Sequence, residues 1–224
     1  MIPWIKNISF FADLSDEAIE AISDISEIIT VNANSTIFKQ DESPDSLYMI
    51  ISGQVAIEKT FSDLKRKKTL AILEAGDFFG EMALITNNKR SASAVSKQES
   101  VLIKVEKTAF VKMLKISAPL CFGMIIVVCK RLKEADEEIS TLSFQNIPGR
   151  IALKLIDLAD QFGVQNDGGI LINLDITHND LSDMVGTNRE TVSKYVSIFK
   201  KEGSIDSINQ KIVIKNHSQL ASWC

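Results

Sequence analysis

The feature of this sequence that most constrains its fold is a heptad pattern over residues 119–145. Apolar side chains recur there at alternating steps of four and three residues, while charged residues occupy the other faces of the predicted helix. Such a narrow seam is typical of a helix that pairs with a copy of itself, so we expect a dimerisation helix over residues 118–146. A single amphipathic helix packed on its own domain is the alternative. The predicted dimer seam consists of Cys121, Ile125, Val128, Leu132, Ala135, Ile139 and Leu142.

The composition is that of an ordinary globular protein with room for two modest domains. The chain has 224 residues, of which 45% are hydrophobic and 24% charged. Residues 1–20 lack a basic start followed by an apolar core, so no signal peptide is expected. The longest apolar run, from Pro119 to Cys129, is too short to cross a bilayer. The three cysteines form no C-x-x-C pair, which indicates a reducing compartment; we therefore expect a cytoplasmic protein without membrane association.

The first half of the chain predicts a β domain. Residues 13–29 favour a short helix with Ser15 as its N-cap, and from about residue 30 to 106 the hydrophobic period changes to two. Short strands at close spacing with turn residues between them predict a closed sandwich or jelly roll. The basic run at residues 65–68 is expected at a hairpin tip as a solvated turn, with a partner contact as the alternative.

Two segments of this domain, residues 78–84 and 89–92, combine groups that suit a phosphate and a sugar. Arg90 can meet a phosphate with two parallel hydrogen bonds, and Ser91 can add its hydroxyl and backbone N–H. Gly80 lets the backbone approach a ligand closely, and Glu81 can accept a hydrogen bond from a ribose 2′-hydroxyl. Each pair of residues is commonplace in turns, but their combination in one β domain predicts a cyclic-nucleotide site. No Cys/His cluster has metal-ligand spacing, so no metal site is expected.

The second half begins at a predicted hinge, residues 146–149, where Pro148 and Gly149 interrupt the long helix. We expect a helix from Arg150 to about Gln161 and a short strand from Ile170 to Leu174. The expected domains are therefore residues 1–117 (β sensor), 118–146 (dimerisation helix) and 147–224. Together they form an α+β chain: an N-terminal jelly roll, a long helix and a C-terminal winged helix-turn-helix.

The helix-turn-helix prediction rests on capping and turn residues. Thr177 and Asp180 form a capping box at the start of one helix, Gly186 makes the turn, and Thr187 with Glu190 suggests a second capping box. Residues 205–208 and 212–214 fit the hairpin of a wing. An ordinary α-hairpin is the alternative. His178, at the start of the first helix, is expected at the surface.

Side chains of the second helix suit the major groove. Arg189 can bind guanine and Glu190 can accept from cytosine, although Glu190 would also serve the capping box. Residues 147–224 carry eight Lys and Arg against nine Asp and Glu, a net charge of −1, so DNA contact would depend on local placement. The candidate DNA-binding residues are Thr187, Arg189, Glu190, Thr191, Ser193 and Lys194.

Several motifs resemble the CRP/FNR family of regulators. FFGEMALITNNKRSASAV is similar to that family's phosphate-binding cassette, LYMIISGQVAI and LEAGDFFGE to the segments that precede it, and RETVSK to its recognition helix. The resemblance implies a homodimeric transcription regulator that binds a near-palindromic DNA site, contacts RNA polymerase and has no enzymatic activity. It also implies cyclic AMP or cyclic GMP as effector. The ligand set that it implies is Gly80, Glu81, Met82, Ala83, Arg90, Ser91 and Ala92, with Asp136.

One position departs from the family pattern. Cyclic-AMP-responsive members have a Thr-Ser pair on the dimer helix, and the matching residues here are Ala135 and Asp136. Asp136 can accept from the adenine amino group or from the guanine edge, or it can be a solvated acid beside the seam. Three hypotheses therefore stay open: control by cyclic AMP or cyclic GMP, a regulator with another effector or none, and a cyclic-nucleotide-binding subunit that acts on a protein.

Overall fold

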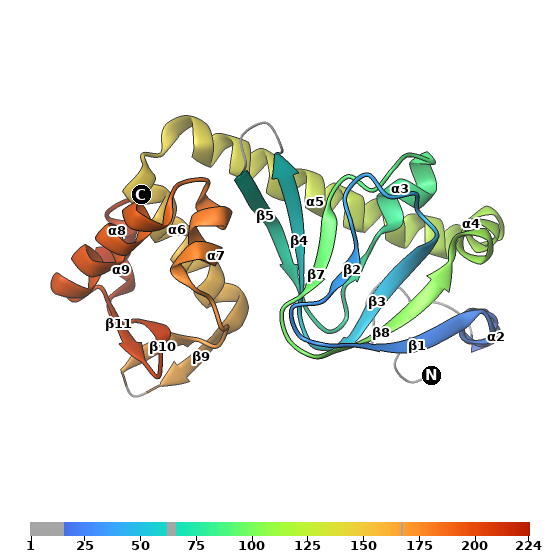
Figure 1. The fold of residues 1–224 in the computed structure, drawn as a ribbon, viewed down its shortest axis with the longest axis horizontal. Helices are drawn as coiled ribbons and strands as arrows, with labels where there is room; N and C mark the ends of the chain where they lie inside the picture. The colour runs from blue at the N-terminus through green and yellow to red at the C-terminus, as the bar shows by residue number, and fades with distance from the viewer. Residues whose placement is uncertain (1–15, 62–65, 167) are drawn as a thin grey trace. The chain divides into compact units, whose positions relative to one another are not determined.

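The computed structural model describes residues 16–61, 66–166 and 168–224 (Figure 1). The chain divides into two compact units, residues 1–133 and residues 134–224, each described by itself below. The first unit contains two antiparallel four-stranded sheets, and the second contains a small sheet with helices around it. This arrangement confirms the predicted α+β class, with an N-terminal β jelly roll and a C-terminal winged helix-turn-helix.

The two sheets of the first unit have the orders β1-β8-β3-β6 and β2-β7-β4-β5. Their alternating apolar residues form two buried clusters, one of which centres on Phe38, Tyr48 and Phe79. The rings of Tyr48 and Phe79 stack with their centroids 5.4 Å apart. The strands are β1 (Ser26–Val31), β2 (Thr36–Phe38), β3 (Ser46–Ser52), β4 (Val55–Phe61), β5 (Arg66–Leu73), β6 (Phe78–Phe79), β7 (Ser93–Ser96) and β8 (Ser100–Glu106).

The predicted helix over residues 13–29 is too long at its C-terminal end. Helix α2 (Asp16–Asp24) is followed at once by β1, which pairs along its whole length with β8. Sheet pairing therefore overrides the helical spacing of the isoleucines in this segment. Ser15, the predicted N-cap, lies outside the described residues.

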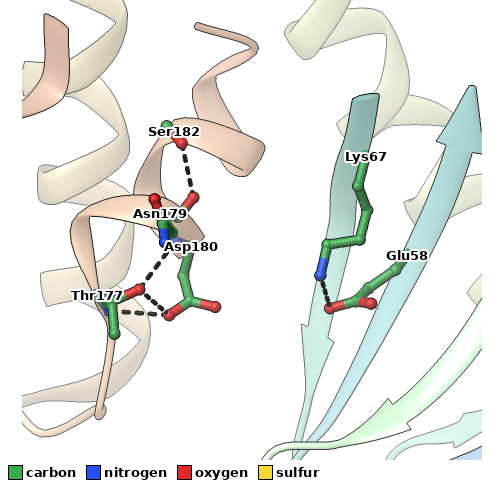
Figure 2. Close-up of polar contacts among 6 residues, drawn as sticks. All are labelled: Glu58, Lys67, Thr177, Asn179, Asp180 and Ser182. Carbon is green, nitrogen blue, oxygen red and sulfur yellow. Dashed lines mark hydrogen bonds and ion pairs between the residues drawn. The ribbon is translucent and has the colours of Figure 1, made fainter. Parts of the chain in front are cut away.

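The basic run also differs from the prediction, because β5 begins at Arg66 rather than after the run. Lys67 and Lys68 are strand residues opposite Thr60 and Lys59 of β4. The ammonium of Lys67 lies 3.0 Å from the buried carboxylate of Glu58 (Figure 2). Lys65 lies outside the described residues.

Three helices complete the first unit and lead into the second: α3 (Glu81–Thr86), α4 (Lys107–Ile116) and α5 (Ala118–Phe144). Leu120 and Met124 of α5 are buried in the second core cluster, with Val127 packed against it. A neighbouring face of α5 carries the predicted seam, and its apolar side chains are exposed in the single chain: Ile125, Val128, Leu132 and Ile139.

The ends of the predicted seam differ from its middle. Cys121 is half-buried, with Sγ 2.9 Å from the carbonyl oxygen of Leu114, so it faces its own unit. Ala135 is exposed. The side chain of Leu142 lies outside the described residues. The dimer seam stays a prediction, and its strongest part is the exposed row at the middle of α5.

The long helix ends earlier than the proline suggests. Helix α5 ends at Phe144, and α6 (Ile147–Phe162) begins with Asn146 as N-cap, whose side chain accepts from the N–H of Gly149. Pro148 therefore lies in the first turn of α6, where a missing N–H costs no helical hydrogen bond. The helix predicted from Arg150 thus begins three residues earlier.

The second unit has a four-stranded antiparallel sheet in the order β11-β12-β10-β9. Strand β9 was not predicted, because with Val164 as its one apolar residue it shows no alternating pattern; all four of its residues are exposed. Strand β10 covers residues 169–172 rather than the predicted 170–174. The remaining elements are β9 (Gly163–Asn166), β10 (Gly169–Ile172), α7 (His178–Val185), α8 (Arg189–Lys201), β11 (Ile205–Ile208), β12 (Lys211–Ile214) and α9 (His217–Ala221).

Candidate functional site

The candidate ligand site is the junction between β6 and α3. Gly80 links the two elements with φ of 89°, a left-handed conformation that side chains with a Cβ rarely adopt. A Cβ atom at this position would lie 2.7 Å from Nη1 of Arg90. Gly80 is therefore required twice, once by the backbone turn and once by the approach of the arginine.

Arg90 is held in the interior of the first unit, with 2% of its surface exposed. Its Nη1 donates to the carbonyl oxygen of Gly80 at 2.7 Å, and its Nη2 donates to that of Ser46 at 2.6 Å. The guanidinium also lies over the ring of Phe38, 4.0 Å from its centroid. Among the described residues, Nε of Arg90 has no hydrogen-bond partner.

Nearby charges partly offset the cost of burying this arginine. Burial lowers the pKa of the Arg90 guanidinium, and the nearby side chains of Tyr48, Asp45 and Glu81 oppose that shift. Asp45 is largely exposed, and its carboxylate lies 3.5 Å from Nη2 of Arg90. Among the described residues, the one carboxylate within ion-pair distance of this guanidinium is the exposed Asp45. A buried guanidinium with an unused donor is therefore suited to an anionic ligand.

Glu81, the first residue of α3, is also buried, with 2% of its surface exposed. Its carboxylate forms an ion pair with Arg131 of α5. Arg131 also donates from Nη2 to the carbonyl oxygen of Phe78 at 2.7 Å and lies over the Phe78 ring, 5.3 Å from its centroid. Burial raises the pKa of the Glu81 carboxyl, and Arg131 acts in the opposite direction.

Arg131 is a site residue that the heptad pattern does not identify, because it falls among the charged residues on the other faces of the predicted helix. A signal was present in the sequence. Arg131 follows Leu120, Met124 and Val127 at steps of four, three and four, on the stripe of α5 that packs on its own unit. A charged residue on an inward-facing stripe requires a partner, and Glu81 is that partner.

The other predicted ligand residues differ in exposure. Ala83 and Ala92 are buried, whereas Met82 and Ser91 are exposed. Asp136 is exposed and belongs to the second unit. The structure therefore brings Gly80, Glu81 and Arg90 together and adds Arg131 to them. Ser91, the residue after Arg90, lies at the surface.

The candidate nucleic-acid site is formed by α7 and α8. Thr177 caps α7 in a reciprocal box with Asp180, as predicted: Thr177 Oγ1 accepts from the Asp180 N–H, and Asp180 Oδ2 accepts from the Thr177 N–H at 2.9 Å (Figure 2). Gly186 ends α7 in the left-handed conformation with φ of 74°. Both helices bury apolar side chains in the core of this unit, among them Leu181 of α7 and Val192 of α8.

The second predicted capping box is wrong. The N-cap of α8 is Asn188, whose Oδ1 accepts from the N–H of Thr191 at 2.8 Å. Asn is a strong N-cap residue, and its position makes Glu190 the second helical residue rather than the third. The Glu190 side chain is exposed and does not serve the cap, so the structural alternative to its predicted DNA role is removed.

The predicted DNA-binding residues lie on or just before the exposed side of α8. Arg189, Glu190 and Lys194 are exposed, whereas Thr187, Thr191 and Ser193 are half-buried. His178 differs from the prediction: it is half-buried, and its Nδ1 lies 2.8 Å from Oγ of Ser193. Burial, followed by the charges of Lys200 and Arg189, lowers the pKa of His178.

Comparison with known families identifies both halves of the chain. Residues 28–117 match the cyclic nucleotide-binding domain, and residues 149–223 match the Crp-like helix-turn-helix domain. Together with the buried Arg90 and the exposed face of α8, these matches define the class of protein: a DNA-binding transcription regulator that carries a cyclic nucleotide-binding domain.

Similar proteins narrow the class. The chain is 31% identical over 169 residues to the cyclic AMP receptor protein of Thermus thermophilus, covering 75% of this chain and 74% of that one. It is 28% identical over 217 residues to a CRP-like cAMP-activated global transcriptional regulator of Mycobacterium tuberculosis, covering 97% and 96% of the two chains. The protein belongs to the CRP/FNR family of transcription regulators, and these are not enzymes, as the sequence predicts.

Solved structures share the fold at lower identity. The c-di-GMP responsive global regulator CLP of Xanthomonas campestris superposes with a TM-score of 0.79 at 22% identity, covering 89% of this chain and 99% of that one. FixK2 of Bradyrhizobium japonicum gives a TM-score of 0.76 at 21% identity, covering 89% and 97%. These likenesses confirm the fold.

Two further observations concern membranes and metals. In the described ranges, no single helix is both long and apolar enough to cross a bilayer; α4 and α5 reach that threshold only as a pair bent by 107°. The part of the chain that the structure describes also contains no group of three or more His, Cys, Asp or Glu residues placed to hold a metal ion.

Proposed function

We propose that this chain is a homodimeric regulator whose DNA binding is controlled by a cyclic nucleotide, cyclic AMP or cyclic GMP, bound at the β6–α3 junction. The observation that carries the proposal is the buried guanidinium of Arg90, which has an unused Nε donor and lies against Gly80 at the start of α3. A matching cyclic nucleotide-binding domain supports the same ligand class, as do relatives named as a cAMP-activated regulator and a cyclic AMP receptor protein.

Binding would be an exchange of hydrogen bonds. Arg90 now donates to the carbonyl oxygens of Gly80 and Ser46, and in the complex it would donate to the cyclic phosphate instead. A phosphate oxygen carries a larger negative charge than a carbonyl oxygen and accepts more strongly, which would offset the cost of releasing the two carbonyls. Ser91, exposed beside Arg90, would add its hydroxyl to the same phosphate.

The sugar would act on α5 through Glu81. A ribose 2′-hydroxyl that donates to the Glu81 carboxylate would compete with, or join, the ion pair between Glu81 and Arg131. Arg131 belongs to α5, the helix that also carries the exposed apolar row. A change at the ligand can therefore reach the dimer helix through the side chain of Arg131. Asp136, five residues further along that helix, is proposed to contact the base.

The two copies of α8 would then read DNA together. In a symmetric dimer, two recognition helices enter successive major grooves about 34 Å apart, which implies a near-palindromic site. Arg189, Glu190 and Lys194 are exposed on α8 as such contacts require. The ligand changes DNA affinity only if it binds the DNA-competent arrangement more tightly than the other arrangement. We also expect a cytoplasmic location and contact with RNA polymerase, in keeping with the family.

Calorimetric titration with cyclic AMP and, separately, cyclic GMP tests the ligand. We expect saturable binding of one nucleotide, lost in Arg90→Ala. The matched control is Lys89→Ala, which removes the neighbouring positive charge from an exposed position and should bind like wild type. Saturable binding that survives in Arg90→Ala would contradict the assignment of the site.

A second candidate function keeps the DNA binding and changes the effector. Ala135 has no polar atom to offer a base, which favours a regulator that answers another small anion or none. A solved relative of the same fold is described as c-di-GMP responsive, so the fold can serve other nucleotides. Absence of heat and of any shift in melting temperature with both cyclic nucleotides would favour this candidate over the first.

A further inference from the structure

A histidine of the second unit lies where a change in its charge would act on the recognition helix. His178 begins α7, and its Nδ1 lies 2.8 Å from Oγ of Ser193 on α8. Both side chains are half-buried, so each stays within reach of a bound partner. One polar contact therefore joins the two helices of the helix-turn-helix on the side where DNA is proposed to bind.

Burial and the cationic groups around this imidazole disfavour its charged form in the free protein. Burial, then Lys200, then Arg189 lower the pKa of His178 from its ordinary value, and both cations belong to α8. Asp180 of its own helix accepts from the N–H and Oγ1 of Thr177. In the described part of the chain, α6, the other helix packed on α7, adds no charged group to this shift. The imidazole is therefore predominantly uncharged at neutral pH.

Bound DNA would reverse this balance. In a helix-turn-helix the second helix enters the major groove while the first crosses the phosphate backbone. Phosphates beside α7 and α8 would offset Lys200 and Arg189 and favour the imidazolium. We propose that His178 contacts DNA and takes up a proton when this chain binds it, so that DNA affinity rises as the pH falls. The inference rests on the DNA interface proposed above for α7 and α8.

Protonation of His178 also changes whether the Ser193 hydroxyl is available as a hydrogen-bond donor. In the neutral tautomer that carries its hydrogen on Nε2, Nδ1 of His178 accepts from the Ser193 hydroxyl, which is then occupied. In the imidazolium, Nδ1–H donates to Ser193 Oγ, and the hydroxyl hydrogen becomes free to reach a base or a phosphate. One proton thus adds a charge next to the DNA backbone and releases a donor on the recognition helix.

The chain supplies its own control, because it contains two histidines, His178 and His217. His217 begins α9 and is exposed. The variants are His178→Gln and His217→Gln, since glutamine keeps a hydrogen-bonding side chain and does not titrate. The probe is a duplex that the wild-type protein selects from a random-sequence pool with both cyclic nucleotides present. Fluorescence anisotropy gives the Kd at fixed salt between about pH 8 and about pH 5.5, where a histidine titrates.

We expect the wild-type Kd for the duplex to decrease as the pH is lowered, by up to about tenfold per pH unit for each proton taken up. His217→Gln should behave like wild type, and His178→Gln should bind nearly as well at the alkaline end and lose the gain at the acid end. At the acid end, His178→Gln should also show a shallower slope of log Kd against log salt, by about 0.9 for each lost phosphate contact. A purely structural histidine would leave that slope unchanged.

Three outcomes refute the inference: a wild-type Kd that is constant with pH, a His178→Gln variant that keeps the full dependence, or a His217→Gln variant that loses it. Should His178→Gln fail to fold, NMR titration of the two wild-type histidine rings decides, because the pKa of His178 must rise when the duplex is added. A wild-type protein that selects no duplex refutes the proposed function together with this inference. One that selects a duplex and binds it equally at every pH refutes only the inference.

Discussion

Replacing Arg131 by alanine tests the link between the ligand site and α5. Arg131 forms an ion pair with Glu81, donates to the Phe78 carbonyl oxygen and lies over the Phe78 ring. The hydrogen bond contributes about 1 kcal/mol and the ring contact about 0.5 kcal/mol. The ion pair contributes about 1.5 kcal/mol, less than a fully buried pair, because 33% of the Arg131 side chain is exposed. The expected loss is about 3 kcal/mol, or roughly 10 °C in Tm for a unit of this size.

The pH dependence of that loss identifies its cause. Glu81 already has a raised pKa in the folded chain, and removal of Arg131 raises it further. A carboxyl whose folded pKa exceeds its unfolded value stabilises the fold at low pH and loses that contribution as the pH rises through the folded pKa. Arg131→Ala should therefore be closest to wild type near about pH 5 and furthest from it near about pH 8.

Differential scanning calorimetry at fixed protein concentration measures both effects. The control is Glu81→Gln, which removes the buried charge and keeps the shape of the side chain. In that background Arg131→Ala should cost only about 1.5 kcal/mol, and the cost should be independent of pH. The reasoning is refuted if Arg131→Ala costs the same stability in the wild-type and in the Glu81→Gln backgrounds. It is also refuted if Arg131→Ala melts within about 1 °C of wild type at both pH values.

Three further predictions concern the ligand turn, the cap of α8 and the dimer seam. Gly80→Ala should weaken nucleotide binding by at least about tenfold in calorimetry, because the new Cβ would lie 2.7 Å from Nη1 of Arg90 and φ at this position is 89°. Asn188→Ala should lower the stability of the second unit by about 1 kcal/mol in thermal melts, whereas Glu190→Ala should leave it unchanged; the reverse order would restore the capping box assigned from sequence. Leu132→Asp should convert the dimer to a monomer in light scattering, since 62% of this side chain is exposed in the single chain, and a variant that stays dimeric would place the interface elsewhere.

The fold could be predicted from sequence wherever a periodic pattern coincided with a strong local signal. The alternating residues of β4 and β8, the capping box of Thr177 and the turn at Gly186 are of this kind. Predictions failed where a long-range partner decided the outcome. Residues 26–29 satisfy a helical period, but they pair with β8, and that pairing depends on residues more than seventy positions away.

The candidate site shows the same division. Gly80, Glu81 and Arg90 lie within one short segment and could be assigned from their chemistry. Arg131 lies 50 positions from Glu81, and only the packing of α5 on the first unit brings the two together. His178 and Ser193 are likewise joined by helix packing rather than by sequence spacing. Contacts between distant elements need the folded chain, because no local propensity encodes them.

The contact between Gly80 and Arg90 also constrains how this regulator can change in evolution. A Cβ at position 80 would lie 2.7 Å from Nη1 of the arginine, so the guanidinium would have to shift to admit any residue other than glycine. A lineage that stopped responding to an anionic effector would first lose the need for the guanidinium, and its removal would open the space above the turn. Loss of Arg90 would remove only one of the two requirements for glycine, because φ at position 80 is 89°. Substitutions there should therefore be confined to descendants that have already replaced Arg90, and to residues such as asparagine that tolerate a left-handed backbone.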